Sequence, residues 1–231
     1  MNEIILMMEI AVVFSLVVLF ERLFSKEGLF VWIAMAGIVA NIQVGKVFML
    51  FGLEATGGNV MFTSIFLAEN ILSFKYGAEQ AQKALKIGIA AVLVYLLGTQ
   101  VLLLYKPFIA DELQDAIGIV FRVTPRICFA SVLMFSLSNV ANIFLFSRLK
   151  MNSKVKNAIT TIGSNCVENF FFALIAFVGL YDFSVILGIA VSTCLIEIFV
   201  GLCDAPFYNY AIRKKAKDGR KETDTDKPAD I

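Results

Sequence analysis

Long apolar runs constrain the fold of this chain more than any other feature of its sequence. Of its 231 residues, 59% are hydrophobic and 17% are charged, and the mean hydropathy is +0.81. A water-soluble domain of this size needs a mostly polar surface, so these values exclude a soluble fold. Because a spanning helix takes about 20 apolar residues, the length fits roughly seven to eight spans with no separate soluble domain.

The apolar runs predict an all-α polytopic membrane protein with about seven transmembrane helices. We expect residues 1–211 to form one transmembrane transporter domain. The charged tail at 212–231 has no apolar spacing, so we predict that it is disordered and cytoplasmic. The predicted spans are Ile4–Phe20, Leu29–Val44, Gly58–Phe74, Ile87–Tyr105, Ile127–Phe146, Ala158–Leu180 and Ser184–Ala211.

The positions of lysine and arginine predict the orientation of these spans. Of the 20 basic residues, only Lys46, Lys106, Arg122 and Arg126 fall on the side opposite to the carboxyl tail. Cytoplasmic loops carry the excess of basic residues. We therefore expect a multi-pass protein of the cell inner (plasma) membrane, with its N terminus outside and its C terminus in the cytoplasm. The net charge of +1 gives no sign of a nucleic-acid-binding patch.

Two connections between the predicted spans differ from ordinary polar loops. The segment GKVFMLFGLEATGG, between the second and third spans, is apolar and rich in glycine. It either lines a substrate cavity or forms an ordinary hairpin at the outer interface, and the sequence leaves both interpretations open. Between Pro107 and Pro125, apolar residues at helical spacing predict an amphipathic helix at the membrane interface.

Composition excludes several kinds of active site. The chain has no histidine, and its four cysteines are scattered through the apolar runs. Zinc sites and histidine-based triads need clustered imidazoles or thiolates, so we predict no metal, no cofactor and no catalytic residue. A membrane enzyme that uses carboxylates alone is the least favoured alternative. We interpret Cys128, Cys166, Cys194 and Cys203 as small packing residues that form no disulfide framework.

Polar side chains inside the predicted spans are the candidate binding residues. A carboxylate at the bilayer centre costs about 2.5 to 3.5 kcal/mol, so it normally faces a cavity or a partner. Glu168 lies near the middle of the sixth span and is the first candidate for substrate contact. The Ser and Asn side chains could instead join helices by hydrogen bonds, and Glu69 could pair with Lys75. The predicted substrate-binding residues are Glu168, Asn165, Asn139, Asn142, Asn70, Glu69 and Asn41.

Several segments resemble the queuosine-precursor transporter family, also called the vitamin-uptake transporter family. They are ANIQVGKVFMLFGLEATGGNVMFTSIFLAENILSFKYGAEQA, RICFASVLMFSLSNVANIFLFSRLK, TTIGSNCVENFFFALIAFVG and EIFVGLCDAPFYNY. The resemblance runs from about Leu29 to Tyr210 and implies a six-helix core at about residues 29–211, to which the first span is an addition. It also implies a bacterial inner-membrane importer of 7-deazaguanine compounds that feed queuosine synthesis in transfer RNA.

The chain keeps some residues of the family pattern and changes others. Glu168 matches the family's acid in the sixth span, and Asn165 matches its amide position. Asn70 and Asn142 stand where members often carry Asp, and Glu197 stands where a Lys is frequent. These departures affect the expected substrate and ion coupling. They could mark a subgroup that prefers another precursor, such as queuine.

The candidate residues suit a purine-like solute. One carboxylate can accept the N–H pair of a guanine-type edge, Asn amides can both donate and accept, and a Phe ring can stack on the heterocycle. Together with this chemistry, the resemblance implies an importer of 7-cyano- or 7-aminomethyl-7-deazaguanine, or of queuine. We expect it to bind its solute near the midplane and to work by alternating access. The alternative is a substrate-capture subunit that binds an ATP-driven module. Because the chain has no Walker motif, the ATP would be hydrolysed by that partner. Membrane lipid is a partner in both cases. The sequence leaves open whether the chain forms a homo-oligomer.

Overall fold

The structure is a computed structural model that describes the backbone of residues 1–108, 112–148 and 153–212. Side chains are described within these ranges except at 135–136, 138–148, 153–162 and 164–165. The predicted tail therefore lies outside the described residues from 213 onward. The elements are α1 (Asn2–Gln43), β1 (Val47–Leu50), β2 (Leu53–Thr56), α2 (Asn59–Tyr76), α3 (Ala78–Leu102), α4 (Glu112–Arg148), α5 (Ser153–Phe177) and α6 (Phe183–Cys203).

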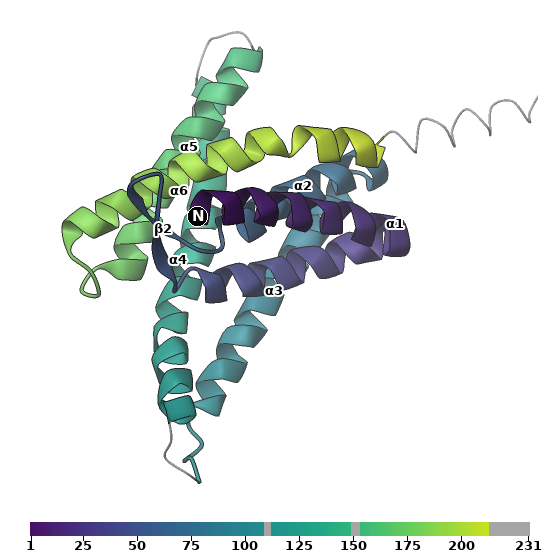
Figure 1. Ribbon diagram of the computed structural model, residues 1–231. Helices are drawn as coiled ribbons and strands as arrows, with labels where there is room; N and C mark the ends of the chain where they lie inside the picture. Colours follow the sequence, from purple (N-terminus) through teal and green to yellow (C-terminus); the bar gives the residue numbers. More distant parts are fainter. Residues whose placement is uncertain (109–111, 149–152, 213–231) are drawn as a thin grey trace, which may run out of the picture.

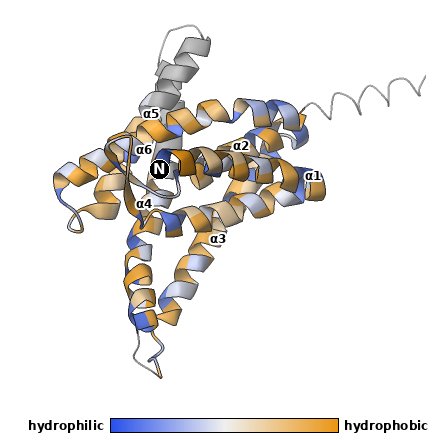
Figure 2. Ribbon diagram, in the orientation of Figure 1, coloured by the Kyte–Doolittle hydropathy of each residue, from blue (hydrophilic) through white to orange (hydrophobic). Residues whose placement is uncertain are grey.

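Several helices have the properties of membrane spans. Within the described residues, the helices that are long and apolar enough to cross a membrane are Asn2–Gln43, Ala78–Leu102, Glu112–Met134 and Phe183–Ile212. Figure 2 shows apolar residues along most of the helices and hydrophilic residues mainly near their ends. The chain is therefore a mainly helical, multi-pass membrane protein, while the predicted number of spans stays a prediction.

α1 consists of two helices that meet at a sharp turn. Ser25 has φ 54° and ψ −135°, so the helical backbone is interrupted there, and the chain turns back on itself (Figure 1). A Cβ at Gly28 would overlap the carbonyl oxygen of Phe20, so glycine allows the two halves to approach closely just after the turn. The halves contain the first and second predicted spans, and both extend closer to the turn than the apolar runs indicate.

The contact between α1 and α2 contains much of the buried core. The indole N–H of Trp32 donates to the Ser64 hydroxyl at 2.9 Å, and both side chains are buried. At the end of α2, the Lys75 ammonium lies 2.7 Å from the Glu21 carboxylate, and each side chain is only 8% exposed. Lys75 thus pairs with Glu21 and not with Glu69, the partner that the sequence left open.

α4 corrects the prediction of a separate interfacial helix. One helix continues from Glu112 through Pro125 to Arg148, so the amphipathic stretch and the fifth predicted span belong to a single element. Proline has no N–H and leaves the carbonyl four residues earlier without its helical donor. That carbonyl, on Phe121, accepts a hydrogen bond of 3.0 Å from the side-chain amide of Gln100 on α3. A neighbouring helix therefore replaces the missing bond, as membrane helices with internal proline require.

The glycine-rich connection folds as an antiparallel β-hairpin, in which Val47 pairs with Thr56 and Leu50 with Leu53. The residues between the strands, Phe51 and Gly52, both have positive φ, as a tight hairpin turn requires. The hairpin packs along α6. There the Ser192 hydroxyl donates to the backbone carbonyl of Glu54. This contact fixes the chain that leads from β2 into α2.

Candidate functional site

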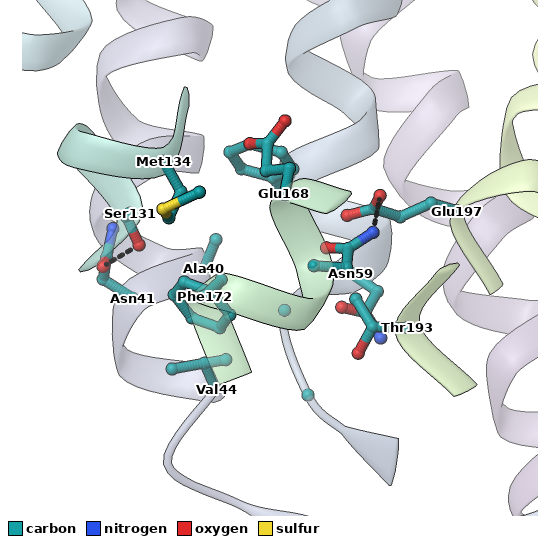
Figure 3. Close-up of a pocket in the computed structure, with 14 residues that line it drawn as sticks. Ala40, Asn41, Val44, Asn59, Ser131, Met134, Glu168, Phe172, Thr193 and Glu197 are labelled. Carbon is teal, nitrogen blue, oxygen red and sulfur yellow. Dashed lines mark hydrogen bonds between the residues drawn. The ribbon is translucent and has the colours of Figure 1, made fainter. Parts of the chain in front are cut away.

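A cavity, which we call the central cavity, lies where α1, α2, α4, α5 and α6 meet, next to the end of the β-hairpin (Figure 3). Each of these elements contributes at least one polar side chain to its wall. Apolar side chains, Phe172 and Met134 among them, form the rest of the lining. The polar lining residues are Asn41, Asn59, Ser131, Glu168, Asn169, Thr193 and Glu197.

Two carboxylates from neighbouring helices face this cavity. Glu168 extends from α5 and Glu197 from α6. The buried amide of Asn169 donates from Nδ2 to Glu197 Oε2 at 2.7 Å, which fixes the orientation of that carboxylate. Among the described residues that line the cavity, none is Lys or Arg. The cavity therefore suits a neutral or cationic solute with N–H donors better than it suits an anion.

A second polar group lies at the opposite side of the cavity. The Ser131 hydroxyl donates to Asn41 Oδ1 at 3.0 Å, and Asn41 Nδ2 donates to the Gly37 carbonyl at 2.8 Å. In Figure 3, Phe172 and Met134 lie between this pair and Glu197. Polar groups at two edges with an aromatic ring between them suit a flat heterocycle that has polar edges and apolar faces.

The cavity is smaller than the usual binding site of a small organic ligand. The cavity measures about 60 Å³. Sites for small organic ligands usually measure about 300 to 1,000 Å³. A solute the size of a nucleobase therefore needs the surrounding helices to move apart before it can occupy this cavity.

The structure brings two of the predicted site residues, Glu168 and Asn41, to this cavity. Glu69 and Asn70 lie on α2 and do not line it. Glu69 is partly buried, with one carboxylate oxygen that has no hydrogen-bond partner within the described residues, and Asn70 is exposed. The remaining predicted residues lie on α4 and α5, and their side chains fall outside the described part of the chain: Asn139, Asn142 and Asn165.

The cavity also contains residues that the predicted set leaves out. Glu197 gives a usable signal, since it is an acid inside an apolar run, like Glu168. Asn169 directly follows Glu168 and shares its helix. Asn59 and Thr193 give no comparable signal, because Asn and Thr are common both at helix starts and between packed helices.

The structure corrects the interpretation of the cysteines as unpaired packing residues. Cys166 on α5 and Cys194 on α6 form a disulfide, with a Cα–Cα distance of 5.5 Å. Cys128 and Cys203 are free thiols, as interpreted from the sequence. Scattered spacing along the chain did not reveal the pair, because antiparallel packing of α5 and α6 brings together residues that are 28 positions apart.

The disulfide predicts how the thiols react. In protein unfolded by detergent without a reductant, a maleimide is expected to modify Cys128 and Cys203, and to modify Cys166 and Cys194 only after reduction. Mass spectrometry of the alkylated peptides measures this difference. In the Cys194→Ser variant, Cys166 is expected to react without reduction. Reaction of all the cysteines in the unreduced wild type would contradict the pairing.

Comparisons with known proteins agree on the class of protein. A family model described as "Putative vitamin uptake transporter" matches residues 56–211. A protein of Bacillus subtilis (strain 168) named "Probable queuosine precursor transporter" is 38% identical over 207 residues, which cover 87% of this chain and 90% of that protein. No solved structure matches the chain. The family model covers every residue of the cavity wall except Ala40, Asn41 and Val44.

Proposed function

Because the chain belongs to the vitamin uptake transporter family, we propose that it imports queuosine precursors across the cell membrane. The proposed solutes are 7-deazaguanine nucleobases such as 7-cyano- and 7-aminomethyl-7-deazaguanine, or queuine. The observation that best supports this proposal is the cavity in which Glu168 and Glu197 face the same space as the Asn41–Ser131 pair. The relative's name gives the solute class, and the cavity chemistry is compatible with it.

Each part of the cavity wall has a role in the proposed binding mode. A carboxylate accepts the N–H groups of the guanine-type edge, and Glu168 is our first candidate for this contact. The hydroxyl and amide of Ser131 and Asn41 serve the carbonyl or ring nitrogen at the other edge. Phe172 stacks on the ring, a contact worth about 1 to 3 kcal/mol for a nucleobase. Asn139, Asn142 and Asn165 remain proposed contacts in a widened cavity.

Transport requires the cavity to open to each side of the membrane in turn. The small volume of the cavity supports a cycle in which helices separate to admit the solute and then close around it. The cavity is lined by residues of α1 and α2 and by residues of α4, α5 and α6. We propose that these two groups of helices move relative to each other during alternating access.

Uptake by the purified protein tests this function. The protein, reconstituted alone into liposomes, is expected to take up labelled 7-cyano-7-deazaguanine in a saturable manner, and unlabelled 7-aminomethyl-7-deazaguanine or queuine is expected to compete. Empty liposomes give the background. Binding without uptake would replace the importer by a substrate-capture subunit of an ATP-driven system. A protein that neither binds nor moves any of these compounds would contradict the proposed solute class.

A further inference from the structure

A second, larger cavity lies between the first half of α1 and the start of β1, and we call it the vestibule. Its polar lining residues are Asn2, Glu9, Gln43 and Lys46, and Gly57 and Gly58 also line it. It measures about 300 Å³. This volume reaches the lower limit of about 300 Å³ that is usual for small-molecule sites. In this conformation the vestibule has more room for a nucleobase-sized solute than the central cavity.

The vestibule and the central cavity share a pair of glycines. Gly57 and Gly58 line both cavities. A Cβ at Gly57 would lie 2.6 Å from the Gln43 carbonyl oxygen, and a Cβ at Gly58 would lie 2.7 Å from the Ala40 carbonyl oxygen. Gly58 also has φ +89°, which side-chain-bearing residues rarely adopt. The glycine pair thus packs directly against the backbone at the end of α1, and this segment forms part of the wall of both cavities.

Glu9, Gln43 and Lys46 offer the vestibule polar groups that a ligand can use. The salt bridges of the described residues involve neither Glu9 nor Lys46, although both line this one cavity. The buried Oε1 atom of Gln43 has no hydrogen-bond partner within the described residues. A carboxylate, an ammonium and an amide together can accept from N–H groups and donate to carbonyl oxygens and ring nitrogens. This set complements the edges of a guanine-type heterocycle.

We propose that the vestibule is a second binding site for the solute, which holds it before it passes the glycine pair into the central cavity. Glu9, Gln43 and Lys46 make the polar contacts at this site. The inference rests on the proposed function, because it takes the same solute class. It also assigns a role to the first half of α1, which supplies Glu9 and closes the vestibule on one side.

Transport kinetics of matched variants test the vestibule. In liposomes, Lys46→Met and Glu9→Gln are each expected to raise the KM for 7-cyano-7-deazaguanine about tenfold with kcat unchanged, since only initial binding is weakened. Lys46→Arg is expected to restore most of the affinity because it keeps the charge and the donors. Lys26→Met removes an exposed lysine that does not line the vestibule, and is expected to behave as the wild type.

Chemical protection locates the solute independently of transport. Ile5 lines the vestibule and is 54% exposed, so Ile5→Cys should react with a maleimide. The solute is expected to slow this reaction, read at the Ile5→Cys peptide by mass spectrometry, even when Glu168→Gln weakens the central cavity. Unchanged KM values and no protection, in a wild type that transports, would overturn the vestibule site alone. A wild type that neither binds nor transports any deazaguanine would overturn the proposed function and this inference with it.

Discussion

Replacing Glu168 or Glu197 by glutamine is expected to lower the uptake of 7-cyano-7-deazaguanine by about tenfold to a hundredfold. Glutamine keeps the size of the side chain but offers one acceptor oxygen, so it cannot accept both N–H groups of a guanine-type edge. A bidentate contact of this kind is worth about 1 to 3 kcal/mol, or about fivefold to 150-fold in affinity, and the expected loss lies within these limits. Initial uptake rates into liposomes and equilibrium binding to the purified protein measure the loss.

Glu69→Gln is the matched control for these variants. Glu69 is also an acid inside an apolar helix, but it does not line the central cavity. Its replacement is expected to leave solute binding close to that of the wild type. In Glu197→Gln, Asn169 can still donate to the remaining carbonyl oxygen, so its effect reports on solute contact more than on folding. Loss of binding in Glu69→Gln, with none in Glu168→Gln and Glu197→Gln, would contradict the central cavity as the site.

Replacing Glu21 by alanine is expected to destabilise the protein by about 3 to 5 kcal/mol in free energy of unfolding, because it removes the carboxylate that lies 2.7 Å from the buried Lys75 ammonium. Both side chains are only 8% exposed, and the pair joins the end of the first half of α1 to the end of α2. Tyr76 also donates its hydroxyl to Glu21, at 3.3 Å. Thermal or denaturant unfolding of the purified protein in detergent measures the change.

Two further variants separate the buried charge from simple loss of packing. The double variant Glu21→Leu with Lys75→Met removes both charges and keeps apolar volume, so it is expected to recover most of the lost stability. Lys26→Ala breaks an exposed ion pair with Glu27, with a distance of 3.9 Å, and is expected to cost at most about 1 kcal/mol. A double variant that is as unstable as Glu21→Ala would contradict this explanation.

The sequence predicts a helix well where local hydropathy determines it. The prediction is poorer where contacts with distant residues determine the course of the helix. Apolar runs place the helices of the described residues, because burial in lipid depends on local hydropathy. They do not reveal that α4 continues through Pro125, since this depends on Gln100 from another helix. They do place a break in the charged stretch 21–28, but they do not reveal that Ser25 alone interrupts α1.

The candidate site, too, could be predicted from the sequence only where local patterns determine it. Glu168 could be predicted because a charge in an apolar run needs a cavity or a partner. The same reasoning applies to Glu197. That Glu168 and Glu197 line the same cavity, however, depends on how α5 packs against α6. Cys166 and Cys194 meet for that reason as well. Tertiary packing therefore decides which polar residues share a cavity. Local patterns in a single sequence do not reveal this packing.

The most direct test of the central claim is an experimental structure of the protein with 7-cyano-7-deazaguanine bound, determined by cryo-electron microscopy or crystallography. We predict density for the solute in a widened central cavity, with its N–H edge at Glu168 or Glu197 and its ring on Phe172. Density in the vestibule as well would agree with the second site. Solute bound away from both acids, in protein shown to transport it, would contradict the claim that this cavity is the substrate site.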